Sequence, residues 1–345
     1  MDSLTQIILG ASVAEAVAGK KMGNKAAFFG AIAGTIPDLD VFMRFFFHPV
    51  ETVLVHRGFS HSIVFAILVS PLLAWLFFQL YKKRYLYKTW LLLFFLGIVT
   101  HPILDAFTNY GTQLFWPFNT RVSFNTIFVL DPLYSVPFGI CLLTCLFISK
   151  HKPIRYKINK IGLIYSSLYL FWGVCIKLFI LSDAKTMMRP GNENKIKSII
   201  VKPMPLTTFY WSILTEEENQ YRIGYKSLFY KFQEKDIESI SKENTCSIDR
   251  LKWKGKNYNK TLALFCGNFG FAEKRKTGFT FYNLRFGTAS MLTQNKFKRP
   301  IFGFEFDTNS KNEIINTKAL NPGESFKEIN TSFYFNKIFW NSSSL

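Results

Sequence analysis

Histidine and aspartate side chains stand in short motifs of the N-terminal part of the chain, at spacings that suit a shared site. The segment HRGFSH places His56 and His61 five residues apart around a glycine, where a turn can direct both imidazoles toward one point. The segment HPILD places His101 and Asp105 four residues apart, on the same face of one helix. For this second pair alone, a structural i, i+4 contact explains the spacing at least as well. The two motifs together favour a binding site.

A third motif supplies further carboxylates. In the segment PDLD, Asp38 and Asp40 flank a leucine directly after a proline. Metal binding is favoured for this pair, with a helix-breaking turn as the alternative interpretation. Imidazole nitrogen and carboxylate oxygen are ligands of Zn, Mn and Fe(II) in proteins. We therefore predict a divalent metal site, with zinc as the first choice. Its candidate ligands are His56, His61, His101, Asp105, Asp38 and Asp40.

Such a site would activate water. A bound metal ion lowers the pKa of a water ligand to about 7 and polarises the bond to be broken. Whichever of Asp38 and Asp40 does not bind the metal can then act as a general base. Arg57 suits a substrate phosphate, although a membrane anchor explains it equally well. Asn109 is predicted to line the substrate cleft, and Asp131, which precedes a proline, is either a helix N-cap or a further substrate-binding residue.

Long apolar segments must position these motifs. A transmembrane helix needs about 20 apolar residues, and the chain has clear apolar runs at 62–81, without a charge, and at 89–107 and 162–182, with one charged residue each. Two further runs, 26–47 and 127–149, are interrupted by aspartate and proline, and residues 3–19 form an additional stretch rich in alanine and glycine. We predict an α-helical integral membrane domain over residues 1–182, with about five to six membrane helices.

The basic residues between these segments predict their orientation. Lysines and arginines cluster at 20–25, 82–88 and 150–160, and such loops stay on the cytoplasmic side. The alternate connections are poor in basic residues and should face outward. This topology brings PDLD, HRGFSH and the end of the HPILD helix together near the outer face, along with Gln6 and Asp131. The C-terminal part would then lie outside the cytoplasm.

The remaining residues, 183–345, have the pattern of a mainly β domain. Short segments rich in β-branched and aromatic residues alternate with glycine, asparagine and lysine clusters. The predicted strands are 196–201, 221–230, 261–266, 278–286 and 300–306.

The charge of the chain has a topological explanation. The formal net charge is +19, yet residues 1–182 contain only seven of the 23 acidic residues. The basic excess of that part reflects orientation in a membrane, so we expect no direct binding to nucleic acid. Membrane lipids are the expected partners of the membrane domain. The surplus of lysine in residues 183–345 also suits anionic headgroups, although a solvated surface without a ligand explains it better.

Several segments also resemble a known group of proteins. The start MDSLTQIILGASVAEAVAGKK, the run GAIAGTIPDLDVF, the segment HRGFSHS, the segment HPILDAFTNYGTQLFWPF and the segment VLDPLY are similar to the LexA-regulated, inner-membrane-associated family of metal-dependent hydrolases. That family is distantly similar to zinc-dependent phospholipases C and S1/P1-type nucleases. The resemblance implies zinc ligands at Asp38, His61, His101 and Asp105. Many relatives have a histidine where this chain has Gln6.

The residues predict an outward-facing metal site in a membrane domain, and the resemblance implies that the protein is a membrane-bound metal-dependent hydrolase. Its substrates would be phosphoesters or lipid-derived molecules, and its site would lie at the outer membrane face of the cell inner membrane. The alternative is a non-enzymatic membrane metal-ion transporter or sensor, because broken helices with acidic residues also form ion paths. A transport path should continue with polar residues toward the cytoplasmic face, where Glu15 is the main candidate.

Overall fold

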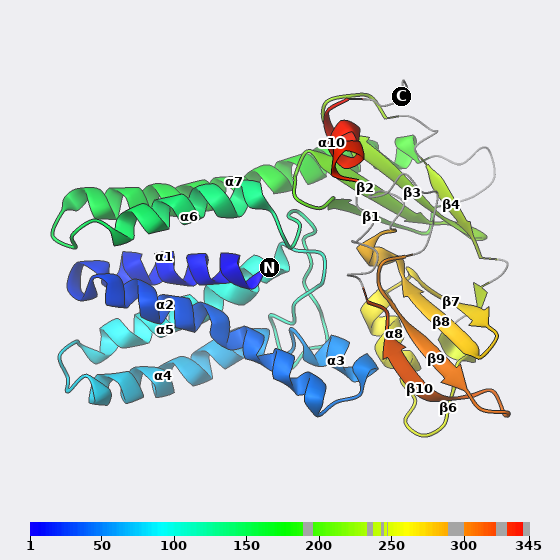
Figure 1. The fold of residues 1–345 in the computed structure, drawn as a ribbon, viewed down its shortest axis with the longest axis horizontal. Coiled ribbons are helices and arrows are strands. Elements are labelled where there is room, and N and C mark those ends of the chain that lie inside the picture. Colours follow the sequence, from blue (N-terminus) through cyan, green and yellow to red (C-terminus); the bar gives the residue numbers. More distant parts are fainter. Residues whose placement is uncertain are drawn as a thin grey trace. The chain divides into compact units, whose positions relative to one another are not determined.

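The computed structural model describes residues 1–188, 196–232, 237–242, 245–246, 248–288, 300–321 and 330–340. The chain divides into two compact units (Figure 1). The helical unit consists of Met1–Met43, Val55–Lys177 and Pro205–Thr208. The β unit consists of Arg44–Leu54, Leu178–Met204 and Phe209–Leu345.

Helices make up the N-terminal part of the chain. They are α1 (Ser3–Met22), α2 (Asn24–Thr35), the 3-10 helix η1 (Ile36–Phe45), α3 (Pro49–Val55), the 3-10 helix η2 (Phe59–His61), α4 (Ile63–Leu80), α5 (Tyr87–Ala106), α6 (Pro132–Leu146) and α7 (Pro153–Met187). Within the described residues, four helical spans are long and apolar enough to cross a membrane: 24–45, 63–80, 87–106 and 153–187. Helix α6 is a shorter apolar helix. Helix α1 falls outside this set because polar residues such as Gln6 and Glu15 interrupt its apolar run.

Glycines let α1, α2 and α5 approach one another closely. A Cβ atom at Gly30 would lie 2.3 Å from the Gly10 carbonyl oxygen, and one at Gly34 would lie 2.6 Å from the Gln6 carbonyl oxygen. A Cβ atom at Gly97 of α5 would likewise lie 2.7 Å from a side chain of α2. Small residues at such crossings are typical of helix packing in membranes. The close packing sets the carboxyl end of α2 beside the last turns of α5.

Aromatic side chains fill the core where α2, α4 and α5 meet. Trp90 and Phe94 are fully buried, and the Trp90 ring lies 5.1 Å from the Phe29 ring, edge to face. Such contacts add to the apolar burial that holds the three helices together.

Two sheets form the β unit. One has the order β1-β2-β3-β4 and the other the order β5-β7-β8-β9-β10-β6, with antiparallel pairs except for β10 with β6. Buried residues of both sheets and of α10 (Thr331–Phe339) share one apolar core. The strands are β1 (Ser198–Pro203), β2 (Tyr210–Glu216), β3 (Gln220–Ser227), β4 (Glu238–Ser241), β5 (Thr245–Cys246), β6 (Lys252–Trp253), β7 (Gly270–Arg275), β8 (Gly278–Asn283), β9 (Gly303–Thr308) and β10 (Glu313–Ala319). A membrane domain followed by a mainly β domain is confirmed.

One predicted strand is wrong. Residues 261–266 belong to the helix α8 (Asn259–Cys266), while the other four predicted strands overlap β1, β3, β8 and β9. Leu262, Phe265 and Cys266 are buried and lie three to four residues apart, on one helical face. In so short an apolar segment, composition alone does not separate this period from that of a strand.

Candidate metal centre

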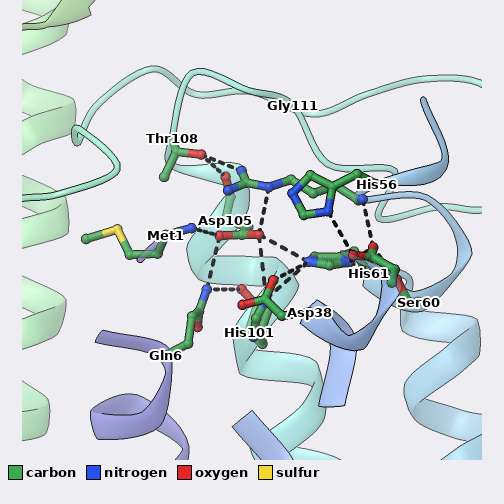
Figure 2. A network of polar contacts seen from close by, with 12 residues as sticks. Met1, Gln6, Asp38, His56, Ser60, His61, His101, Asp105, Thr108 and Gly111 are labelled. Carbon is green, nitrogen blue, oxygen red and sulfur yellow. Dashed lines mark hydrogen bonds and ion pairs between the residues drawn. The ribbon is translucent and has the colours of Figure 1, made fainter. Parts of the chain in front are cut away.

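The ends of several helices of the helical unit converge on one polar cluster (Figure 2). Asp38 and Asp40 lie on η1, which continues directly from α2. His61 ends η2, just before α4 begins. His101 and Asp105 lie in the last turns of α5.

Three side chains point donor atoms at a common centre. His101 Nε2 lies 3.1 Å from His61 Nε2, and both nitrogens lie 3.4 Å from Asp38 Oδ1. Both imidazoles are buried, whereas the Asp38 side chain keeps 26% of its surface exposed. The centre can therefore be reached from the side of Asp38.

Backbone and carboxylate groups orient the two imidazoles. His101 Nδ1 donates to the Gly34 carbonyl oxygen at 2.6 Å, and His61 Nδ1 lies 3.1 Å from Asp40 Oδ2. When a metal ion displaces any proton from Nε2, a proton retained on each Nδ1 leaves both Nε2 lone pairs facing the centre. This is the arrangement in which proteins present histidine to a metal.

The spacing of the three atoms suits a zinc ion. Zinc holds imidazole nitrogen and carboxylate oxygen at about 2.0–2.2 Å in a tetrahedron, so neighbouring ligand atoms stand about 3.4 Å apart. The separations of 3.1–3.4 Å among Asp38, His61 and His101 match that figure. Among the residues that the structure describes, Asp38, His61 and His101 form the group of side chains that could hold a metal ion.

Asp40 and His56, both predicted ligands, lie one contact further out. Asp40 Oδ1 is 2.8 Å from His56 Nδ1, while Oδ2 accepts from the Arg57 backbone N–H at 3.0 Å and from Ser60 Oγ at 2.8 Å. The Oδ2 atom also faces His61 Nδ1. Asp40 therefore holds the HRGFSH segment in shape and orients His61.

Asp105 lies at the buried side of the cluster. Its Oδ2 atom is 3.4 Å from His61 Nε2, 3.6 Å from His101 Nε2 and 3.1 Å from Arg57 Nε, yet makes no hydrogen bond with any described residue. Its Oδ1 atom accepts from Gln6 Nε2 at 3.0 Å and contacts the amino group of Met1. Gln6 thus contacts this cluster through its side-chain amide.

The three predicted substrate-binding residues have different surroundings in the structure. Arg57 is buried and donates through Nη1 to Thr108 Oγ1 at 2.8 Å, with its guanidinium over the Tyr110 ring. Asn109 is buried in the segment just after α5. Asp131 is the N-cap of α6, with Oδ1 accepting from the first turn of that helix and Oδ2 from the Tyr169 hydroxyl at 3.0 Å. Of its two interpretations, the structure shows the N-cap.

Some contacts of the cluster had no clear signal in the sequence. The Gly34 carbonyl oxygen and the Met1 amino group carry no side-chain signature. Ser60, which donates to Asp40, lies between the two histidines of HRGFSH, and its position in that motif was the indication that it contacts the cluster.

Comparison with known proteins identifies the helical part. The family model of the YdjM inner membrane protein matches residues 1–180, more than half of the chain. The chain belongs to the YdjM family. Every residue of the candidate metal centre falls inside the matched range, and the apolar helices agree with a multi-pass protein of the inner membrane.

Two relatives of this YdjM family member cover different shares of it. The Bacillus subtilis protein YfhP is 25% identical over 236 residues, which are 65% of this chain and 68% of YfhP. The Escherichia coli inner membrane protein YbcI is 34% identical over 97 residues, which are 28% of this chain and 55% of YbcI. No solved structure matches the chain.

Metal binding to this YdjM family member should depend on pH. Burial disfavours the charged form of His61, but contacts with Asp105, Asp38 and Asp40 outweigh it and raise the pKa of His61 to about 10. A metal ion must therefore displace a proton from His61 at neutral pH. Between about pH 6 and about pH 8, we expect affinity to rise about tenfold per pH unit, with release of about one proton per ion. Calorimetry in buffers of different ionisation enthalpy measures both, and a pH-independent affinity would contradict the prediction.

Replacing Asp40 should weaken metal binding without removing a metal contact. The Asp40→Ala variant removes the carboxylate that faces His61 Nδ1 and leaves that nitrogen with Ser60 Oγ, 3.0 Å away, so the imidazole is held less firmly. Loss of such an orienting carboxylate costs about 10-fold to 100-fold in metal affinity. A competition titration against a fluorescent zinc chelator measures the change. The matched control is Glu51→Ala, which removes one carboxylate outside the cluster and should leave the affinity unchanged.

Proposed function

We propose that this protein is a membrane-bound, metal-dependent hydrolase of phosphoester or lipid-derived substrates. The observation that supports it most is the convergence of His61 Nε2, His101 Nε2 and Asp38 Oδ1 at separations that suit a tetrahedral metal ion. A catalytic metal site keeps a position open for water or substrate. The partly exposed Asp38 supplies that access.

Each residue of the cluster has a distinct part in this proposal. Asp38, His61 and His101 hold a divalent ion, which lowers the pKa of a water ligand and polarises the substrate. Asp40 orients His61 and the HRGFSH segment, because both of its carboxylate oxygens already contact neighbouring groups. Asp105 Oδ2, which makes no hydrogen bond with described residues, is available as a fourth ligand or as the acceptor of a proton from water.

The surroundings favour a charged substrate group near apolar surface. Arg57 brings a guanidinium to the buried side of the cluster, next to Asp105. Phe115, Trp116 and Phe118 are exposed in the segment that follows α5. Aromatic side chains concentrate at membrane–water interfaces, which fits a substrate derived from a lipid.

We place the metal centre and the C-terminal residues on the extracytoplasmic side. The basic loops at 20–25, 82–88 and 150–160 support this orientation through the positive-inside rule. Green fluorescent protein, which fluoresces only when it folds in the cytoplasm, tests it. A fusion after Lys150 should fluoresce and a fusion after Met187 should not; the opposite pattern would reverse the topology.

The transporter alternative has less support. Among the described residues, Glu15 is the buried carboxylate of α1, and both of its oxygens accept hydrogen bonds from Arg155. An acidic group paired in this way does not extend a cation path from the cluster. Uptake of zinc into proteoliposomes that contain the protein would favour transport instead.

Hydrolysis can be tested on the full chain in lipid nanodiscs loaded with Zn²⁺ or Mn²⁺. The probes are bis(p-nitrophenyl) phosphate for phosphodiesters, p-nitrophenyl butyrate for carboxylic esters, and phosphatidylglycerol followed by phosphorus NMR. We expect metal-dependent turnover of at least one phosphoester, absent from His61→Ala and retained by His151→Ala. A protein that binds one metal ion per chain and hydrolyses none of the probes would overturn the proposal.

A further inference from the structure

A second polar pocket lies in the helical unit, away from the metal centre. It has a volume of about 350 Å³ and is formed by the carboxyl end of α1, the α6–α7 connection and the first turns of α7. Besides Glu15, Pro153 and Tyr156, its lining is basic: Lys20, Lys150, His151, Lys152, Arg155 and Lys157.

The positive charge of this pocket is not compensated by carboxylates. Glu15 is the acidic residue of the lining, and Arg155 neutralises it through Nε to Oε1 at 2.6 Å and Nη2 to Oε2 at 2.7 Å. Lys20, Lys152 and Lys157 are exposed and form no ion pair with a described acidic residue. Their ammonium groups are therefore available to an anion.

Hydrogen bonds hold the lining in place, so the pocket is more than a mobile basic loop. Arg155 Nη1 donates to Asn24 Oδ1 and to the Ile148 carbonyl oxygen, both at 2.7 Å. Lys150 Nζ donates to the Lys21 carbonyl oxygen at 3.1 Å. These bonds fix the α6–α7 connection against the α1–α2 turn.

The pocket lies at the level where the apolar surface of α7 begins. Ile161, Ile164 and Leu168 are exposed apolar residues of α7, and Ile161 follows Lys157 by one helical turn, about 6 Å along the axis. Tyr156 is exposed and contacts the Lys20 ammonium, 4.9 Å from its ring centre. A tyrosine and several lysines just outside an apolar span mark the headgroup region of a membrane.

We propose that this pocket binds the phosphate group of an anionic membrane phospholipid. Basic pockets between membrane helices on the cytoplasmic side recognise such headgroups, and the volume falls in the range of small-ligand sites. The lysines supply ammonium donors to the phosphate, while the acyl chains follow the apolar surface of α7. The proposal does not depend on hydrolase activity at the metal centre.

Lipid titrations of the full chain in detergent micelles test this assignment. The probes are short-chain phosphatidylglycerol, short-chain phosphatidylcholine and glycerol 3-phosphate, with binding followed by native mass spectrometry. The pocket variant is Lys150→Gln/Lys152→Gln/Lys157→Gln. The matched control is Lys82→Gln/Lys83→Gln/Lys88→Gln, which removes the same charge from a basic connection that does not line the pocket.

We expect the wild type and the control variant to bind phosphatidylglycerol at least about tenfold more tightly than phosphatidylcholine, and the pocket variant to lose that preference. Equal losses in both variants would overturn the proposal, because net charge alone would then explain binding. Equal affinity for the two lipids would also overturn it. Binding of glycerol 3-phosphate as tight as that of phosphatidylglycerol would replace the lipid by a soluble phosphate. Unchanged unfolding temperatures in detergent identify variants that remain folded.

Discussion

The His101→Ala variant should lose the divalent metal ion, from about one ion per chain to a level near that of a metal-free control. His101 supplies one of three converging donor atoms, and the Gly34 carbonyl oxygen fixes its ring. Removal of the imidazole leaves His61 Nε2 and Asp38 Oδ1 of the three converging atoms, one fewer than the three protein ligands of a catalytic zinc site. Mass spectrometry of the metal content of purified protein measures the loss. The Asp105→Ala variant leaves all three converging atoms in place and should lose less metal than His101→Ala.

Controls separate this effect from misfolding. The exposed His151, in the connection before α7, provides the matched histidine, and His151→Ala should retain the metal. Both variants should still insert in the membrane, because the apolar length of α5 is unchanged by one substitution. Full metal occupancy in His101→Ala would show that the ion binds elsewhere.

The Glu15→Met variant should be the most destabilised single variant of the helical unit. Glu15 and Arg155 are both buried, with side chains 4% exposed, and their ion pair joins α1 to α7. Removing one partner leaves an uncompensated buried charge, which costs about 3–5 kcal/mol. Thermal unfolding in detergent micelles, followed by tryptophan fluorescence, measures the change.

A double variant shows whether charge is the cause. Glu15→Met/Arg155→Met removes both charges, and replacing a buried ion pair by apolar residues is often neutral. We expect it to recover most of the lost stability, with a remaining deficit from the bonds of Arg155 to Asn24 and Ile148. A double variant no more stable than Glu15→Met would show that the loss arises from packing. The coupling energy follows from the four proteins of this cycle.

Much of the cluster was accessible from local patterns. His101 and Asp105 lie on one helix, so helical geometry alone predicted that they would share a face. The prediction that Asp38 and His61 lie near that face required the predicted order and orientation of the membrane segments as well. The sequence did not predict that Asp40 and His56 lie outside the group of three converging donor atoms. A histidine or an aspartate can bind a metal ion directly or hydrogen-bond to a residue that does, and the residue type is the same in both cases. The exact rotation of η1 decides between them.

The sequence by itself determined that this chain has an apolar helical part, a mainly β part and a short set of histidines and aspartates with metal-binding chemistry. Those features follow from the composition of the segments and the spacing of their apolar residues, because local interactions and the bilayer determine which segments form helices or strands. The tertiary structure decided which donor atoms meet, because the close approach of α1, α2 and α5 at Gly10, Gly30 and Gly97 sets distances that residue spacing does not contain. It also paired Glu15 with Arg155, residues 140 positions apart. Contacts between distant segments depend on packing, and packing is a property of the whole helical unit.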